Sequence, residues 1–120
     1  MREAIRDRGR LEHIMMAIDN VNEYMKGTAT LEEFAANKMQ FHAVVYNIQI
    51  VGEAAYKLTH EFCDAHPAVP WKHIISMRHI IVHGYYTVKV QGVWNIVQND
   101  LPPLREQIAA YIAEFPEDEE

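Results

Sequence analysis

The sequence predicts an all-α fold, an antiparallel helical bundle of four to five helices, and three observations support this. Apolar residues recur at three- and four-residue spacing in three long stripes. Glycine, proline or a capping threonine stands between successive stripes. Apolar residues make up 49% of the 120 residues, which suffices for the core of one domain and argues against disorder. We therefore expect one helical domain at residues 1–115 and an acidic tail at residues 116–120.

The first two helices are predicted by an apolar stripe and by a capping motif. Gly27 supplies a left-handed stop after a stripe that consists of Leu11, Ile14, Met15, Ile18, Val21 and Met25. Thr30 and Glu33 then form a T-x-x-E capping box. This box predicts a short second helix that begins at Leu31 and ends near Asn37.

The middle of the chain predicts a long helix and a shorter one. A third helix of about six turns follows from apolar residues four and three apart, namely Phe41, Val44, Ile48, Val51, Ala55, Leu58 and Phe62. Gly52, inside this stripe, is small enough to let a neighbouring helix approach closely. Residues 66–70 contain two prolines and must form a connection, and Pro70 suits a helix start. A fourth helix is therefore predicted from Trp71 to about Val82, ended by Gly84.

The last third of the chain offers two alternatives for its helix. Residues 86–90 are β-branched and extended in character, and we interpret them as a loop rather than a short strand. Pro102 and Pro103 interrupt a final stripe that consists of Val93, Val97, Leu101, Leu104, Ile108, Tyr111 and Phe115. Either a helix begins near Asp100, or a longer helix is kinked there.

Charge is distributed unevenly along the chain. Seventeen acidic residues against eleven lysines and arginines give a formal charge of −6, which argues against bulk attraction to nucleic acid or to an anionic membrane. Residues 65–99, however, hold Lys72, Arg78 and Lys89 and no acidic residue. This acid-free block is a candidate anion-binding surface.

Compartment and membrane contact can also be predicted. The single cysteine, Cys63, excludes an intramolecular disulfide and fits a reducing environment. No apolar stretch approaches the roughly 18 residues needed to span a bilayer, and residues 1–10 lack the apolar core of a signal peptide. We expect a cytoplasmic protein without a membrane segment.

The densest group of reactive side chains lies within the acid-free block, at RHIIVHGYY. Arg78 offers a permanent charge with a planar fork of donors that suits phosphate. His83 titrates near neutrality and can move protons, and Tyr85 adds a donor and a flat face. Together these residue types supply what metal-free cleavage of RNA needs.

The spacing of these residues constrains how they meet. Arg78 and His83 are five residues apart, about 140° around an ideal helix, so one regular helix does not easily aim both at one phosphate. Either the helix loosens before Gly84, or a second copy of the chain completes the site. The second alternative predicts a symmetric homodimer.

Other interpretations of the same residues stay open. His79 and His83 have the spacing of a satisfied pair on one helix face, and also that of a two-histidine metal site. No carboxylate or cysteine stands nearby to complete a metal site, so we expect no metal. Asn47 and Glu53 lie in or beside the third stripe and need polar partners, and we expect one of them to pair with Arg78 or the histidines. No glycine-rich phosphate loop occurs, and we expect no cofactor.

The pattern Arg78-x4-His83-x-Tyr85 resembles the R-x4-H-x-Y signature of the HEPN superfamily. The similarity extends over residues 4–113 and resembles the HepT-like toxin branch, through the stretches IRDRGRLEHI, QFHAVVYNIQIVGEAAYKL, PWKHIISMRHIIVHGYY and VWNIVQNDLPPLREQI. His79 departs from the asparagine that is commoner after the arginine. This departure leaves open which histidine serves as acid and which as base.

The resemblance implies a helical bundle that pairs as a homodimer, with the two motifs meeting at a cleft. It implies a metal-independent endoribonuclease toxin, with Arg78 and His83 catalytic and with Tyr85 and His79 in positioning or auxiliary roles. It also implies a minimal nucleotidyltransferase antitoxin that adds AMP to Tyr85 and can assemble with the toxin. The alternative is a non-catalytic subunit that binds nucleotide or substrate for such a nucleotidyltransferase.

Overall fold

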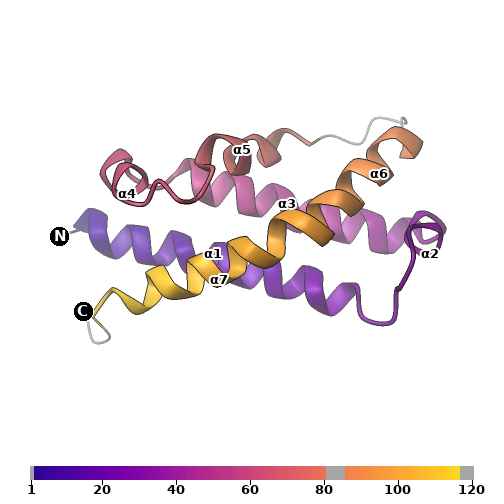
Figure 1. Cartoon of the computed structure of the whole chain (residues 1–120), viewed down its shortest axis with the longest axis horizontal. Helices are drawn as coiled ribbons and strands as arrows, with labels where there is room; N and C mark the ends of the chain where they lie inside the picture. The colour runs from indigo at the N-terminus through magenta and orange to yellow at the C-terminus, as the bar shows by residue number, and fades with distance from the viewer. Residues whose placement is uncertain (1, 81–85, 117–120) are drawn as a thin grey trace.

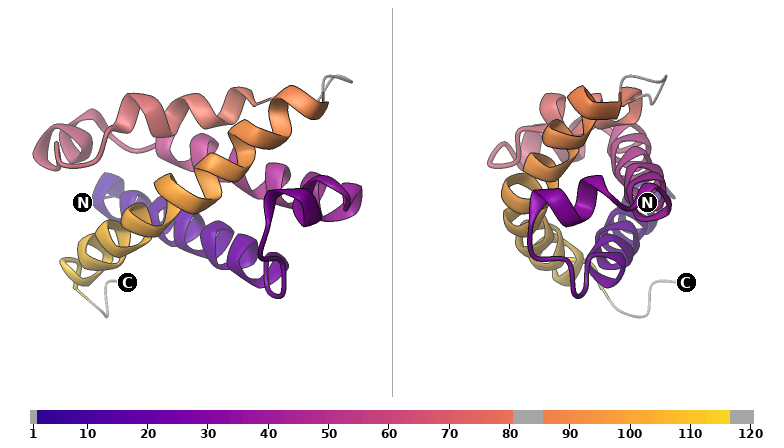
Figure 2. Two further views of the ribbon diagram at one scale, coloured as in Figure 1. Left: turned by 45° about the vertical axis from the view of Figure 1, so that its right-hand side comes forward. Right: turned by 90° about the vertical axis from the view of Figure 1, so that its right-hand side faces the viewer.

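The helices of the computed structural model run up and down along one long axis (Figure 1). α1 (Arg2–Tyr24) and α3 (Lys38–Tyr56) pack against each other in opposite directions. α5 (Trp71–Ser76) lies on α3, and α7 (Leu101–Ala113) lies along α1. Two further views show these helices surrounding one core (Figure 2). The arrangement confirms the predicted all-α class, but the described residues form more α-helices, α1 to α7, than the four to five that were predicted.

The structure describes residues 2–80 and 86–116, and within these ranges the regular structure is helical, with no strand. A single cluster of buried apolar side chains fills the centre, and the three long stripes supply its largest members: Leu11, Ile14, Ile18, Val44, Ile48, Leu101, Leu104 and Ile108. None of the described helices combines the length and the apolar character that crossing a membrane requires.

The first predicted turn and cap are confirmed. Gly27 has a φ of 83°, the left-handed conformation that glycine adopts without steric cost. α2 (Leu31–Ala35) then begins with a complete capping box. The Thr30 side chain accepts from the backbone N–H of Glu33, and the Glu33 carboxylate accepts from the backbone N–H of Thr30. Two donors that the helix itself leaves unpaired are thereby satisfied.

The prediction of one helix over residues 41–62 was wrong. α3 ends at Tyr56, and α4 (His60–Ala65) begins a separate helix after Thr59. Thr59 is the N-cap, because its hydroxyl accepts from the backbone N–H of Phe62. The Asp7 carboxylate, from α1, accepts from both the backbone N–H and the hydroxyl of Thr59. These contacts hold Thr59 in an extended conformation, which breaks the helix although the apolar stripe continues.

The prediction of a loop at residues 86–90 was also wrong. α6 (Tyr86–Asn95) is helical over the whole of this stretch and packs against α2. Val90 and Val93 are buried in the core, and the ring of Trp94 contacts that of Phe34 at 5.9 Å between centroids. Tertiary burial therefore overrides the weak helix preference of β-branched residues.

The two prolines of the last stripe lie directly after a π-helical segment. η2 (Ile96–Asp100) continues α6 without a break, and α7 follows at once with prolines in its first turn. The backbone N–H of Leu101 donates to the carbonyl of Ile96, five residues back. Proline has no N–H to donate, so it is tolerated at this point. The alternative of one longer, disturbed helix therefore describes this region better than a separate helix start does.

Candidate functional site

The motif arginine lies where the fourth predicted helix comes to an end. Arg78 and His79 belong to the 3-10 helix η1 (Met77–His79), which continues α5. Ile80 then has φ −68° and ψ 118°, an extended conformation. The prediction that this helix continues to Val82 was therefore wrong, and the helix loosens well before Gly84.

The other half of the motif lies outside the described residues. His83 and Tyr85 were both predicted as site residues from the sequence, and both remain predictions. The structure does establish that the α-helix tightens into a 3-10 turn at residues 77–79 and ends at the extended Ile80, so the 140° separation of an ideal helix does not apply to Arg78 and His83.

Glycine at position 52 brings the Arg78 backbone onto α3. A Cβ atom at Gly52 would collide with the backbone nitrogen of Arg78 and would lie 2.9 Å from the carbonyl carbon of Met77. Real Cβ atoms essentially never come that close to backbone, so only glycine permits this contact. The prediction that Gly52 allows a neighbouring helix to approach closely is confirmed.

Two more side chains on the same face of α3 hold the segment that carries Arg78. The Gln49 amide donates a hydrogen bond to the carbonyl of Ile80. The Arg78 guanidinium lies over the Tyr56 ring, 3.7 Å from its centroid, a cation–π contact. Because Gln49, Gly52 and Tyr56 are three and four residues apart, they share one helix face and form a cradle under Arg78.

The charge of Arg78 is left without a carboxylate partner among the described residues. Its Nε is buried and has no hydrogen-bond acceptor there. Two other arginines are neutralised: Arg105 pairs with Asp19 at 2.7 Å, and Arg8 pairs with Glu12 at 3.2 Å. An unpaired guanidinium beside a solvent-exposed turn is a group that can receive an anion.

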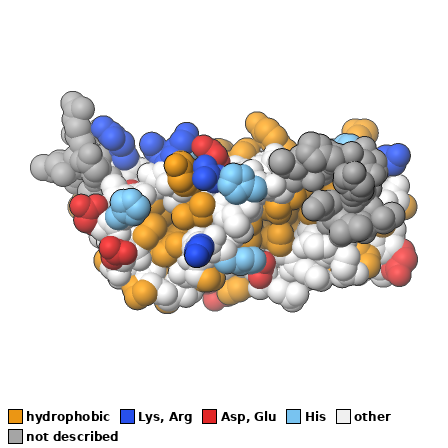
Figure 3. Space-filling model, turned by 90° about the horizontal axis from the view of Figure 1, so that it is seen from above, with side chains coloured by type: hydrophobic (Ala, Val, Ile, Leu, Met, Phe, Trp, Pro, Cys, Tyr) orange, Lys and Arg blue, Asp and Glu red, His pale blue; other side chains and the backbone are white. Residues whose placement is uncertain are grey.

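The surface around this arginine is mixed in character. His79 and Lys72 are both exposed, and Tyr56 is 53% exposed. Seen from above, the molecule carries Lys, Arg and His side chains, and also Asp and Glu side chains, between hydrophobic ones (Figure 3). The anion-binding surface that the acid-free block indicates stays a prediction.

Asn47 and Glu53 do not pair with Arg78. Asn47 is 3% exposed, and its amide donates to the Ala43 carbonyl at 2.9 Å and accepts from Asn20 at 3.1 Å. It therefore joins α3 to α1. Glu53 is exposed and lies 3.9 Å from Lys57, one turn later. Both residues find other polar partners, and neither pairs with Arg78.

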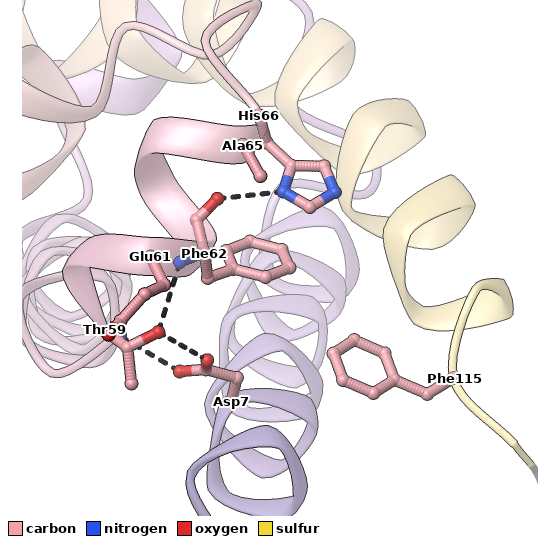
Figure 4. A pocket seen from close by; sticks show the side chains of 7 residues that line it. All are labelled: Asp7, Thr59, Glu61, Phe62, Ala65, His66 and Phe115. Carbon is pink, nitrogen blue, oxygen red and sulfur yellow. Dashed lines mark hydrogen bonds between the residues drawn. The ribbon is translucent and has the colours of Figure 1, made fainter.

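A pocket lies beyond the C-terminal end of α3, between α4 and the end of α7 (Figure 4). It measures about 600 Å³, and its walls are Asp7, Thr59, Glu61, Phe62, Ala65, His66 and Phe115. Burial alone would lower the pKa of His66, but hydrogen bonds to the Phe62 carbonyl and the Glu114 carboxylate, with the charge of Glu114, raise this pKa. In Figure 4, hydrogen bonds join Asp7 to Thr59, Thr59 to the Phe62 backbone N–H, and His66 to the Phe62 carbonyl.

Neither a metal site nor a reactive thiol is found in the part of the chain that the structure describes. No three His, Cys, Asp or Glu residues there come together in a way that would hold a metal ion. Burial, with smaller effects from Asp7 and Asp64, raises the pKa of the Cys63 thiol. A raised pKa leaves little thiolate, so Cys63 behaves as a packing residue.

The sequence analysis missed Gln49 and Tyr56 as residues that hold the site. Both lie on the outward face of the third stripe, among residues that the stripe itself leaves to solvent. The only available signal was Gly52, whose small size predicted a close approach on this face. Which segment makes that approach was not readable from the sequence.

Comparison with known proteins places the chain among ribonucleases. Residues 14–111 match the family described as Ribonuclease HepT-like. A protein from Caldanaerobacter subterraneus subsp. tengcongensis, named as a putative RNase, is 34% identical over 82% of this chain and 87% of its own. A probable ribonuclease HepT from Thermococcus cleftensis is 33% identical over 79% of this chain and 86% of its own.

One relative is much longer than this chain. It comes from Methanocaldococcus jannaschii and is named as a gamma-glutamylcyclotransferase and putative RNase. It is 34% identical, and the chain spans 47% of its length. No solved structure matches the chain significantly. The family match covers most of the chain, including Arg78, His83 and Tyr85, and the chain belongs to the HepT-like ribonuclease family of the HEPN superfamily.

Proposed function

We propose that the protein is a metal-independent endoribonuclease that cleaves RNA at the Arg78–His83–Tyr85 site. The observation that carries this proposal is Arg78 itself. Its guanidinium has no carboxylate partner among the described residues and is held by a cradle on α3. A fixed and unneutralised guanidinium matches the charge that develops on phosphate oxygens during cleavage.

The proposed reaction uses the ribose as its own nucleophile. His83 takes the proton of the 2′-hydroxyl, and the 2′ oxygen attacks phosphorus. The bond from phosphorus to the 5′ oxygen breaks, and a histidinium, either His83 or His79, returns a proton to that oxygen. The products are a 2′,3′-cyclic phosphate and a 5′-hydroxyl end. Arg78 stabilises the negative charge on the non-bridging oxygens, and Tyr85 positions the substrate.

We further propose that two copies of the chain form the working unit. One face of α3 exposes Met39 and Tyr46, which are 85% and 64% accessible to solvent. Large apolar side chains exposed on one helix face suit contact with another protein. A homodimer across this face would bring the motifs of the two copies together. The second copy would then complete a site that one helix alone cannot form.

In this proposal the protein is a toxin whose partner is a minimal nucleotidyltransferase antitoxin. AMP added to Tyr85 would place bulk and negative charge next to Arg78, and both would repel the RNA phosphate. An intact-mass spectrum of protein co-expressed with the antitoxin should then contain added AMP. Tyr85→Phe should abolish that addition.

Cleavage of RNA by the purified, unmodified protein in EDTA tests the function directly. Arg78→Ala should lower the rate about 10²- to 10³-fold, as expected for loss of a charge-stabilising donor. His83→Ala should lower it about 10²- to 10⁴-fold, as expected for loss of a general acid or base. Arg105→Ala is the matched control, because Arg105 is paired with Asp19 and lies outside the site.

Two outcomes would contradict the proposal. Full activity in His83→Ala would remove that residue from the chemistry. No cleavage by clean wild-type protein, with RNA or nucleotide still bound, would instead favour the non-catalytic binding subunit. Circular dichroism of each variant should match wild type, so that a lost activity is not a lost fold.

A further inference from the structure

Two buried guanidinium nitrogens without an acceptor lie on the two sides of α3. One is Nε of Arg78, and the other is Nε of Arg10, which α1 contributes. Within the described residues, Arg10 has no carboxylate partner, and its Nε has no hydrogen-bond acceptor. Buried polar atoms in proteins are nearly always satisfied, so two such donors flanking one helix call for a shared explanation.

Arg10 opens into a pocket of its own. The pocket measures about 210 Å³, and its walls come from α1 and α3: Arg10, His13, Ile50, Glu53, Ala54 and Lys57. We call it the Arg10 pocket. Gly52 and Tyr56 contact Arg78 on one flank of α3, whereas Ala54 and Lys57 border the Arg10 pocket on the other. One helix, about 10 Å across, separates the two cations.

The charged side chains of the Arg10 pocket differ in whether an opposite charge neutralises them. Lys57 lies 3.9 Å from the Glu53 carboxylate, so these two side chains neutralise each other. Arg10 has no such partner, and the exposed His13 stands beside it. The pocket therefore presents one free positive charge, and Glu53 is the acidic side chain in its wall that weakens the attraction for an anion.

Tyr56, the last residue of α3, contacts one of these cations and directly precedes a residue that borders the pocket of the other. It is half-exposed, it contacts Arg78 at 3.7 Å, and it is the neighbour of Lys57. Cations that follow a nucleic-acid backbone, with an exposed aromatic ring between them, are typical of surfaces that bind single strands.

We propose that the Arg10 pocket is a second phosphate subsite for the same RNA strand. The strand crosses α3 over Tyr56, with one phosphodiester at Arg78 and another at Arg10. This inference rests on the proposed function, which supplies RNA as the substrate class. It gives Arg10 a role in binding the strand and no role in the chemical step. Arg10 touches a phosphate remote from the bond that breaks, so it contributes to affinity and to KM.

Binding of an uncleavable strand tests the subsite without requiring turnover. The probe is a fluorescent 2′-O-methyl oligoribonucleotide, which lacks the nucleophile, and anisotropy gives its affinity over a series of salt concentrations. Arg10→Gln should weaken binding and reduce the slope of log affinity against log salt by about 0.7, the release of one counterion from a single strand. Glu53→Gln should tighten binding, because it frees Lys57. Arg105→Gln, the matched control, should change neither.

The results separate this inference from the proposed function. An Arg10→Gln variant with unchanged affinity and salt slope would overturn the subsite, whether or not the wild type cleaves RNA. An Arg10-dependent slope in a protein that cleaves nothing would support the subsite and contradict the ribonuclease. A change in oligomeric state on size-exclusion chromatography, with RNA affinity unaltered, would assign Arg10 to contact between copies and would overturn the subsite.

Discussion

Two regions of the molecule use polar side chains in opposite ways. At the end formed by α1, α4 and the end of α7, which we call the closed end, the side chains of Asp7, Thr59 and His66 all have hydrogen-bond partners. Asp7 is 4% exposed, and its oxygens accept from the Thr59 backbone N–H at 2.9 Å and the Thr59 hydroxyl at 2.7 Å. His66 bonds the Phe62 carbonyl at 2.8 Å and the Glu114 carboxylate at 3.0 Å.

The Arg78 region differs from the closed end in what it leaves unpaired. The backbone around Arg78 is held closely by Gly52 and Gln49, but the guanidinium contacts only the Tyr56 ring among the described residues. Satisfied groups stabilise the native state, whereas a fixed donor without an acceptor keeps its bonding capacity for a ligand. The comparison indicates that stability is built at the closed end and binding capacity at the Arg78 region.

Removal of the Asp7 carboxylate should destabilise the closed end without changing the rate of RNA cleavage. Asp7→Ala strips the Thr59 backbone N–H of its acceptor in a buried place, which should lower the free energy of unfolding by about 2 kcal/mol. Urea denaturation measures this loss, and kcat of the folded fraction should equal that of the wild type. Asp64→Ala, an exposed acid of α4, is the control. A large fall in kcat for Asp7→Ala would contradict the division between the two regions.

A change at Tyr56 should lower the rate of cleavage and leave the closed end intact. Tyr56→Leu removes the ring under Arg78, and a cation–π contact at an exposed site contributes about 0.5–1 kcal/mol, so kcat should fall about two- to fivefold. Tyr56→Phe keeps the ring and should restore kcat. Tyr24→Leu, another exposed tyrosine, should have no effect. Equal losses in the leucine and phenylalanine variants would rule out the ring as the support of Arg78.

The smallest expected effect is a pH dependence at the closed end. Because the folded protein raises the pKa of His66, the stability that its bonds contribute is complete below the unfolded pKa of about 6.5. It is lost as the pH rises through the higher folded value. Glu114→Gln should therefore destabilise the protein more at pH 6 than at pH 8.5 by thermal unfolding. A larger effect at the higher pH would contradict this assignment.

Some features of the fold were readable in the sequence because they depend on neighbours along the chain. The apolar stripes set which helix faces are buried, and the capping box at Thr30 starts α2 where it predicted. Gly27 takes the left-handed conformation that its position required. The acid-free block indicated a candidate anion-binding surface around Arg78, whereas the expected pairing of Arg78 or the histidines with Asn47 or Glu53 is not found with Arg78.

Other features depended on partners far away in the sequence. The break at Thr59 is made with Asp7, 52 residues earlier, and the segment after Arg78 is held by Gln49, 31 residues before Ile80. Helicity at residues 86–90 follows from burial of Val90 against other helices. A periodic pattern records which face is apolar, but it does not record which contact ends a helix or overrides a residue's preference.

The sequence by itself determined the helical class, the family and the residue types of the site. Only the tertiary structure decided that Arg78 rests on Tyr56, that Gly52 admits its backbone, and that Arg10 lies across the same helix. The physical reason is that composition and spacing act along one helix, whereas the support of a charged side chain comes from whichever helix packs beside it.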